Sequence, residues 1–240
     1  MDEKNVSQPF HDSEQFAFLE PIRQAAPMLR EDALRVIKGF RAVTWMRRST
    51  FSRHHGFCEG FRGRFLLSHA GIQFGLNQSM CPHAAVWVDQ IPGLVTLGFF
   101  LLDAESHIKP HRGEFNGTLR AHLGLVVPTG CQLRVADQTQ PWQEKAWLVF
   151  DDFFEHEAWN TSENTRCVFH IEFFKPEVTE IQREERLTQV RTAITGMTQQ
   201  HGQAMASAGL SGDLQLTEAL EPYKKGPAQP LVQRFGLFFD

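Results

Sequence analysis

The sequence predicts a mainly β protein, a sandwich or barrel flanked by helices. Between about Leu94 and Phe174, short apolar runs rich in Val, Leu and Phe follow one another along the chain. Turn-forming stretches separate these runs, with PTG at 128–130, ADQTQP at 136–141 and NTSENT at 160–165. Several short strands with such frequent turns are typical of an all-β sandwich or barrel.

The segment before this region has a mixed, partly helical pattern. The run PIRQAAPMLREDALRVIKGF places apolar residues at helical spacing, which predicts short helices interrupted at Pro27. The stretch 51–65 is rich in Phe, Gly, Arg and His. We expect loop or lid material there that covers a pocket, and the alternative is packing of a helical layer against a sheet.

The strand with the clearest alternation is Arg166–Phe174. Because successive side chains of a strand point to opposite faces, it has one largely apolar and one polar face. The residues of the first face are Cys167, Phe169, Ile171 and Phe173, and those of the second are Arg166, Val168, His170 and Glu172. After this strand, the apolar spacing from Glu177 to about Ala208 predicts a helix. The tail after Gly209 docks on the core or on a partner, and the pattern does not decide which.

Composition excludes several classes of protein. The chain has 240 residues, of which 42% are hydrophobic and 22% charged, as in ordinary globular proteins. The net charge of −4 gives no electrostatic reason to expect a nucleic-acid partner. No apolar run reaches the length of a membrane span, and the polar start MDEKNVSQPF is unlike a signal peptide. Four cysteines without a CxxC pair fit a reducing compartment, so we expect a cytoplasmic protein.

We expect a single domain over residues 1–240, because a chain of this length can bury one sizeable core. Residues 1–80 would form an N-terminal mixed and helical wrap. Residues 82–178 would form the β core that carries the chemistry. Residues 179–240 would add a C-terminal helix and tail. The sequence does not predict an oligomeric state.

Polar side chains concentrate on strands that are otherwise apolar. His111 follows Pro110, and Arg120 and His122 lie two residues apart, so they share one face of a strand. His156 precedes the last strand, which Arg166 opens. A buried Arg or His is costly unless it is paired or bound to something. Two arginines and three histidines inside one small barrel would require an anion and a metal ion to compensate them.

Each of these residues also has an ordinary explanation. A single His on a strand is usually a satisfied core or rim residue, and Arg120 could be a surface cation on an edge strand. Arg166 could form an ion pair with Asp151, Asp152 or Glu155 across the barrel. The joint pattern instead suggests a mononuclear iron site beside a dicarboxylate pocket. Neutral imidazoles suit Fe(II), and a guanidinium can engage both oxygens of a carboxylate.

Three runs carry a resemblance to a known family: HIKPHRGEFNGTLRAHLGLVVP, WLVFDDFFEHEAW and TRCVFHIEFFKPE. Over about residues 82–178 the chain resembles the aspartyl/asparaginyl β-hydroxylases. It is also similar to the bacterial lipid A hydroxylases, through PHRGEFNGTLRAHLGL and CPHAAVWVDQIPGL. The resemblance implies a double-stranded β-helix, which is a cupin-like jelly roll, and Fe(II)/2-oxoglutarate-dependent dioxygenase activity.

The resemblance also implies roles for particular residues. His111 and His156 match the two iron-binding histidines. Arg120 and His122 match residues that engage 2-oxoglutarate near the metal, and Arg166 matches the arginine that holds its distal carboxylate. We also expect Thr118, Gly113 and His170 to belong to the substrate pocket.

The ligand position two residues after the first histidine departs from the commonest pattern. Most enzymes of this chemistry have an acid there, whereas this chain has Gly113. The aspartyl/asparaginyl hydroxylases that it resembles also have glycine at this position, and the lipid A type has an acid. We expect water to fill the vacated position and Glu114 to point elsewhere. Replacement of Gly113 by Asp should be tolerated at least partly, since it restores a three-ligand set.

A second departure concerns Thr118. Hydroxylases that act on aspartyl residues of EGF-like domains have an arginine there that helps to hold the substrate's acid. A hydroxyl is a poor counter-group for a desolvated anion. We therefore expect that EGF-like domains are not substrates of this chain.

The predicted function is a hydroxylase that uses Fe(II), 2-oxoglutarate and O2 on an unactivated C–H bond, with succinate and CO2 as co-products. The expected substrate is a small molecule or peptide, with the reaction at the β-carbon of an aspartyl/asparaginyl-like or other amino acid. A carrier-bound amino acid and an acyl chain remain open. Two alternatives remain: a halogenase with chloride beside Gly113, and a non-enzymatic jelly-roll module that binds a small acid.

Overall fold

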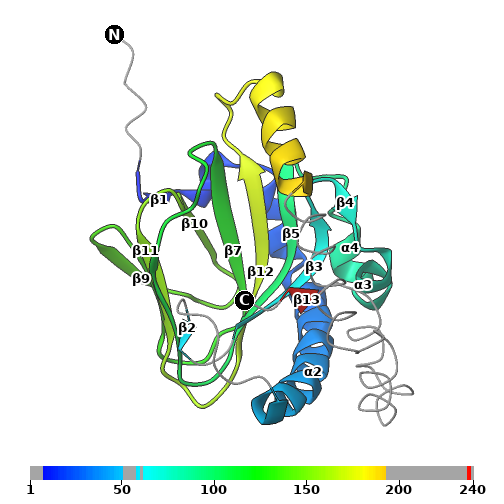
Figure 1. Ribbon diagram of the computed structural model, residues 1–240, viewed down its shortest axis with the longest axis vertical. Coiled ribbons are helices and arrows are strands. Elements are labelled where there is room, and N and C mark those ends of the chain that lie inside the picture. Colours follow the sequence, from blue (N-terminus) through cyan, green and yellow to red (C-terminus); the bar gives the residue numbers. More distant parts are fainter. Residues whose placement is uncertain (1–7, 51–57, 60–61, 193–236, 239–240) are drawn as a thin grey trace, which may run out of the picture.

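The computed structural model describes residues 8–50, 58–59, 62–192 and 237–238. Two antiparallel β-sheets face each other, and the helix α2 covers the far side of the larger sheet (Figure 1). The larger sheet contains, in spatial order, β1 (Phe10–His11), β10 (Trp147–Phe150), β7 (Thr118–Val126), β12 (Arg166–Phe174), β5 (Leu94–Leu102), β3 (Arg62–His69) and β13 (Leu237–Phe238), with β4 (Ile72–Gln73) paired to β3. The smaller sheet contains β2 (Cys58–Glu59), β6 (Ser106–His111), β11 (His156–Asn160), β8 (Cys131–Val135) and β9 (Gln138–Pro141).

The strand order defines a jelly roll. From β5 to β12 the chain crosses repeatedly between the two sheets. The first of these eight strands pairs with the last, β6 pairs with β11, β7 with β10 and β8 with β9. This nested pairing is a double-stranded β-helix, so the predicted fold class of a mainly β jelly roll with flanking helices is confirmed.

The two faces of β12 separate as the alternation predicts. Cys167, Phe169 and Ile171 are fully buried in the core between the larger sheet and the helices. On the opposite face, Val168 belongs to a second core between the two sheets, where Leu133 of the smaller sheet also lies. The polar face of the strand therefore points into the barrel.

The N-terminal wrap contains η1 (Ser13–Gln15), α1 (Leu19–Gln24), α2 (Ala26–Thr50), α3 (Gly75–Met80) and α4 (Pro82–Ala85). The break expected at Pro27 falls two residues earlier, at Ala25 between α1 and α2, and Pro27 lies in the first turn of α2, where a missing N–H costs nothing. The buried Asp32 of α2 accepts a hydrogen bond of 2.9 Å from the backbone N–H of Ala84. This contact joins α2 to the start of α4.

The prediction of a loop over 51–65 is wrong for part of that stretch. Residues 51–57 and 60–61 lie outside the described residues, but β2 and the first half of β3 are strands. Phe65 and Leu67 of β3 are fully buried on the helix side, whereas Arg64 faces the barrel interior. Because the inner face of β3 is polar, the hydrophobic pattern alone did not predict a strand there.

The C-terminal region begins with a helix over residues 180–192. Its Leu187 packs against the small core of Val95, Phe174 and Val178. The predicted continuation to about Ala208 lies outside the described residues, as does most of the tail. Leu237–Phe238 docks on the core by pairing with β3. Within the described part of the chain, no helix has the length and apolarity required to cross a membrane.

Candidate active site between the two sheets

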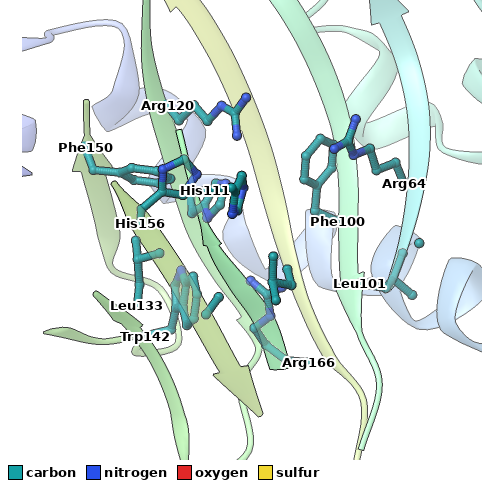
Figure 2. A pocket seen from close by; sticks show the side chains of 14 residues that line it. Arg64, Phe100, Leu101, His111, Arg120, Leu133, Trp142, Phe150, His156 and Arg166 are labelled. Atoms are coloured by element: carbon teal, nitrogen blue, oxygen red, sulfur yellow. The ribbon is translucent and has the colours of Figure 1, made fainter. Parts of the chain in front are cut away.

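A pocket lies between the sheets, and most of the predicted site residues line it (Figure 2). The larger sheet contributes Gly63, Arg64, Phe100, Leu101, Arg120, His122, Phe150 and Arg166. The smaller sheet contributes Ile108, His111, Leu133, His156 and Ala158, and Trp142 follows β9. Five of the residues that the sequence predicts for the site, which come from four different strands, therefore meet in one place.

His111 and His156 form a pair at the centre of this pocket. They are register partners in the β6–β11 ladder, and their ring centroids are 4.2 Å apart. Nδ1 of His111 lies 2.7 Å from the carbonyl oxygen of Lys109, and Nδ1 of His156 lies 2.9 Å from that of Phe154. Because a carbonyl oxygen only accepts, each Nδ1 carries the hydrogen. In the neutral rings Nε2 then carries the lone pair that binds a metal ion.

His156 is held neutral by its surroundings. Burial lowers its pKa to about 3, and the nearby charges of Arg120 and His111 act in the same direction. Only 4% of the residue is exposed. A neutral imidazole is the form that binds a metal, so no proton has to be displaced from this ring.

The carboxylate of Asp152 occupies the space in front of Gly113. A Cβ built on Gly113 would lie 2.3 Å from Oδ2 of Asp152, far inside van der Waals contact. The backbone N–H of Gly113 also donates to the Asp152 carbonyl at 2.7 Å. The structure therefore predicts, against the expectation from the sequence, that Gly113→Asp is disfavoured, because its side chain would meet this carboxylate unless Asp152 moves.

Asp152 is a site residue that sequence analysis missed, since it was considered only as a partner of Arg166. It is 3% exposed and forms an ion pair of 2.8 Å with Arg120. Burial raises its pKa to about 6, although Arg120 acts in the opposite direction. Its position four residues before His156 in FDDFFEH was visible, but the contact with Gly113 depends on the fold.

Arg166 is almost fully buried, and no described carboxylate forms an ion pair with it. It is 3% exposed, and among the described residues its Nε and Nη1 have no hydrogen-bond partner. Its guanidinium carbon lies 4.4 Å from the centre of the Trp142 ring. Burial lowers its pKa to about 10, so the group remains charged at neutral pH.

The three carboxylates considered as partners of Arg166 are paired elsewhere. Asp151 bonds to Lys175 at 2.7 Å, Asp152 to Arg120, and Glu155 to Arg134 at 3.1 Å. The interpretation of Arg166 as an internal ion pair therefore does not hold.

Arg120 is not a surface cation on an edge strand. Its strand β7 lies between β10 and β12, and its side chain is 24% exposed in the pocket. Glu172 is directly opposite in the β7–β12 register. Burial acts to raise the pKa of Glu172, but Arg120 and the Thr96 hydroxyl outweigh it, so the net pKa is lowered. Arg120 thus has two carboxylates nearby.

Thr118 differs from its predicted position. It is 2% exposed, and its hydroxyl donates to Glu172 Oε1 at 3.3 Å. It is absent from the pocket lining formed by the described residues. The hydroxyl is therefore used inside the sheet, because Glu172 lies within its reach on the neighbouring strand.

His122 and His170 are buried side by side, one strand apart. Nε2 of His122 lies 2.9 Å from Nδ1 of His170, and the two residues are register partners. His122 lines the pocket, whereas His170 lies behind it and stacks on Phe100 with ring centroids 3.8 Å apart. Burial lowers the pKa of both rings well below the usual value, so both are neutral at pH 7.

Aromatic residues of the pocket were also missed by sequence analysis. Phe100 and Phe150 lie on strands, where the alternation of side chains could have predicted that they point into the barrel. Trp142 comes from the segment after β9 and had no such signal. Its ring packs against His122, with centroids 6.0 Å apart, as well as against Arg166.

Fold and site together define a cupin-like jelly roll with two histidines and a buried arginine in its barrel. In the described ranges, no group of three or more His, Cys, Asp or Glu has the geometry of a metal site. The family model for aspartyl/asparaginyl β-hydroxylase matches residues 23–176. The chain belongs to this family.

Individual relatives carry hydroxylase names. An ornithine lipid ester-linked acyl 2-hydroxylase from Rhizobium tropici is 35% identical over 172 residues, covering 70% of this chain and 61% of that protein. The human aspartyl/asparaginyl β-hydroxylase is 42% identical over 86 residues, covering 35% of this chain and 11% of that protein. The chain thus spans less than two thirds of the length of either relative.

Among solved structures, AviO1 from Streptomyces viridochromogenes aligns with a TM-score of 0.40 and 15% identity. The alignment covers 65% of this chain and 86% of that one. A cupin domain of a transcriptional regulator from Enterobacter cloacae aligns with a TM-score of 0.30 and 11% identity, covering 38% and 90% of the two chains.

Proposed function

We propose that this chain is an Fe(II)/2-oxoglutarate-dependent dioxygenase that hydroxylates an unactivated C–H bond. The observation that carries the proposal is the buried Arg166 in the same pocket as the His111–His156 pair. A buried guanidinium without a carboxylate partner in the described part of the chain is costly unless a ligand supplies the anion. A dicarboxylate that also reaches a metal would satisfy both features.

The residues present fit both groups. His111 and His156 would hold the iron through Nε2, since their Nδ1 hydrogens are engaged by backbone carbonyls. The bound iron and 2-oxoglutarate supply oxygen activation, with succinate and CO2 as co-products.

The chain itself binds and orients the co-substrate. Arg166 would engage the distal carboxylate through Nε and Nη1, which are unsatisfied within the described chain. His122 would contact the carboxylate nearer the metal. Trp142 and Phe150 pack against His122 and would exclude water from this part of the pocket. Arg120, held by Asp152, lies on the other side of the histidine pair, where we place the substrate (Figure 2).

The proposed substrate is an aspartyl/asparaginyl-like or other amino acid, reacting at its β-carbon. A second candidate is an ester-linked acyl chain, reacting at its 2-position. It is favoured by the Rhizobium tropici relative, whose similarity covers 70% of this chain. Incubation with each substrate type, followed by mass spectrometry for a gain of one oxygen, would separate the two.

Halogenation is disfavoured by the surroundings of Gly113. A chloride in the vacated ligand position would lie against the Asp152 carboxylate, because that carboxylate already fills the space of a side chain at 113. Two anions in one buried space repel each other strongly.

The test is succinate release by the purified protein with Fe(II), 2-oxoglutarate and O2. A dioxygenase should release some succinate even without its substrate, and His156→Ala should release none. A small-acid-binding module should bind 2-oxoglutarate without any succinate. That outcome would overturn the enzymatic proposal.

A further inference from the structure

The buried His170 has no role in the site described so far, yet it touches one of its residues. It lies on β12 directly opposite His122 of β7, and the two rings share a hydrogen bond of 2.9 Å. Phe100 stacks on its other side at 10° between ring planes. His170 is therefore locked between a phenyl ring and the His122 imidazole.

The second nitrogen of His122 is in the opposite situation. His122 lines the pocket, and its Nδ1 is buried without a hydrogen-bond partner among the described residues. A buried polar nitrogen of this kind costs free energy unless a ligand completes it. Nε2 of His122 is hydrogen-bonded to His170, whereas Nδ1 of His122 would need a partner from a ligand in the pocket.

Two neutral imidazoles can share one hydrogen in two ways. If His122 donates from Nε2, its Nδ1 carries a lone pair, which would repel a carboxylate in the pocket. If His170 donates from Nδ1, His122 carries its hydrogen on Nδ1 and can donate it to that carboxylate. Arg166 in the same pocket shows that an anion is expected there, which selects the second arrangement.

We propose that His170 is a positioning residue that donates to Nε2 of His122 and thereby presents the Nδ1 hydrogen of His122 to the co-substrate carboxylate. The proposal rests on the proposed function for the identity of this carboxylate. The tautomer can be measured on the protein without knowing which anion binds.

The first experiment measures 2-oxoglutarate binding by calorimetry, with Mn(II) in place of iron so that no turnover occurs. His170→Leu should weaken binding by about 10-fold or more, the equivalent of one hydrogen bond to a charged group. His170→Asn should largely restore it, because the Asn amide nitrogen is as far along the side chain as Nδ1 of His. His107→Leu, on the outer face of the smaller sheet, is the matched control and should leave affinity unchanged. Equal affinity of wild type and His170→Leu would overturn the proposal.

The second experiment reads the tautomer directly by NMR of protein labelled with ¹⁵N-histidine, without metal. Wild type and His170→Asn should show His122 with its hydrogen on Nδ1, assigned by the signals that His122→Gln lacks. His170→Leu should lose this preference. An Nε2 hydrogen on His122 in wild type would refute the proposal. If wild type binds no 2-oxoglutarate, the proposed function fails, while the tautomer measurement still decides the role of His170.

Discussion

Arg120 and Arg166 both project from the larger sheet into one pocket, on opposite sides of the histidine pair, but their surroundings differ (Figure 2). Arg120 is 24% exposed, forms an ion pair with Asp152 and lies opposite Glu172. Arg166 is 3% exposed and rests on Trp142, with no carboxylate paired to it in the described part of the chain.

The two buried arginines therefore differ in whether the protein itself supplies the balancing charge. Arg120 has its charge balanced by Asp152 and Glu172, although its Nε and Oδ1 of Asp152 have no hydrogen-bond partner among the described residues. Arg166 leaves a charge for which the described residues provide no counter-ion, which is costly for the protein alone and useful for a ligand. An unbalanced group is therefore a better guide to a binding site than a polar residue that is already satisfied.

The largest effect is expected at the histidines between the two arginines. His156→Ala should weaken Fe(II) binding by more than the ~10–100-fold that is typical when only a partner of a metal ligand is changed. His107→Ala, on the outer face of the smaller sheet, should leave it intact. Anaerobic metal titration measures both. Wild-type affinity in His156→Ala would remove the metal site from this pocket.

The next effect concerns the unbalanced arginine. Truncation of one partner of a buried charge pair costs about 2–5 kcal/mol, or roughly 30- to 5,000-fold in affinity. Arg166→Ala should raise the Kd for 2-oxoglutarate by such a factor, and Arg166→Lys should rescue little, because an ammonium lacks the planar fork. Calorimetry with Mn(II) provides the measurement. An unchanged Kd would make Arg166 a structural arginine.

The comparison also predicts opposite effects on stability without ligands. Arg120→Leu should lower the free energy of unfolding by about 3 kcal/mol, since it leaves Asp152 and Glu172 buried without their cation. Arg166→Leu should be neutral or raise it by about 1–3 kcal/mol, because it removes a desolvated charge. Urea unfolding of the metal-free variants measures both. Equal losses in the two variants would contradict the distinction drawn between the arginines.

A substitution at Gly113 tests the part of the pocket around Arg120 and Asp152. Gly113→Asp should lower the free energy of unfolding by about 1–3 kcal/mol, the usual cost of overpacking, because its side chain meets the Asp152 carboxylate. Asp152→Gly in the same chain should recover much of this loss by vacating the space. Gly75→Asp is the control, since no described atom lies within 4 Å of a Cβ there. Thermal unfolding that is unchanged in Gly113→Asp would show that Asp152 moves aside freely.

The last effect is a pH dependence from the His122–His170 pair. Burial lowers the pKa of both rings well below 6.5 in the folded state, whereas the unfolded chain titrates near 6.5. The unfolded state therefore binds more protons below pH 6.5, and the stability present above that pH is lost as the pH falls. Each ring contributes about 1.4 kcal/mol per pH unit. Urea unfolding between pH 7.5 and 5 should show a slope that His170→Leu reduces by this amount.

The sequence by itself determined the class of fold and most of the candidate residues. Strand alternation is a local pattern, so it separated the two faces of β12 correctly. Polar residues on otherwise apolar strands stand out for the same reason, and the local pattern therefore singles out His111, Arg120 and Arg166.

Only the tertiary structure decided which of these residues meet. The contact of Asp152 with Gly113 and the bond between His122 and His170 depend on strand order and register. The use of Thr118 inside the sheet depends on Glu172 across the same ladder. These pairings join residues distant in the chain, and a periodic pattern contains no information about which strands become neighbours. Register is set by the packing of whole sheets, because a slip of one residue would turn every side chain to the opposite face.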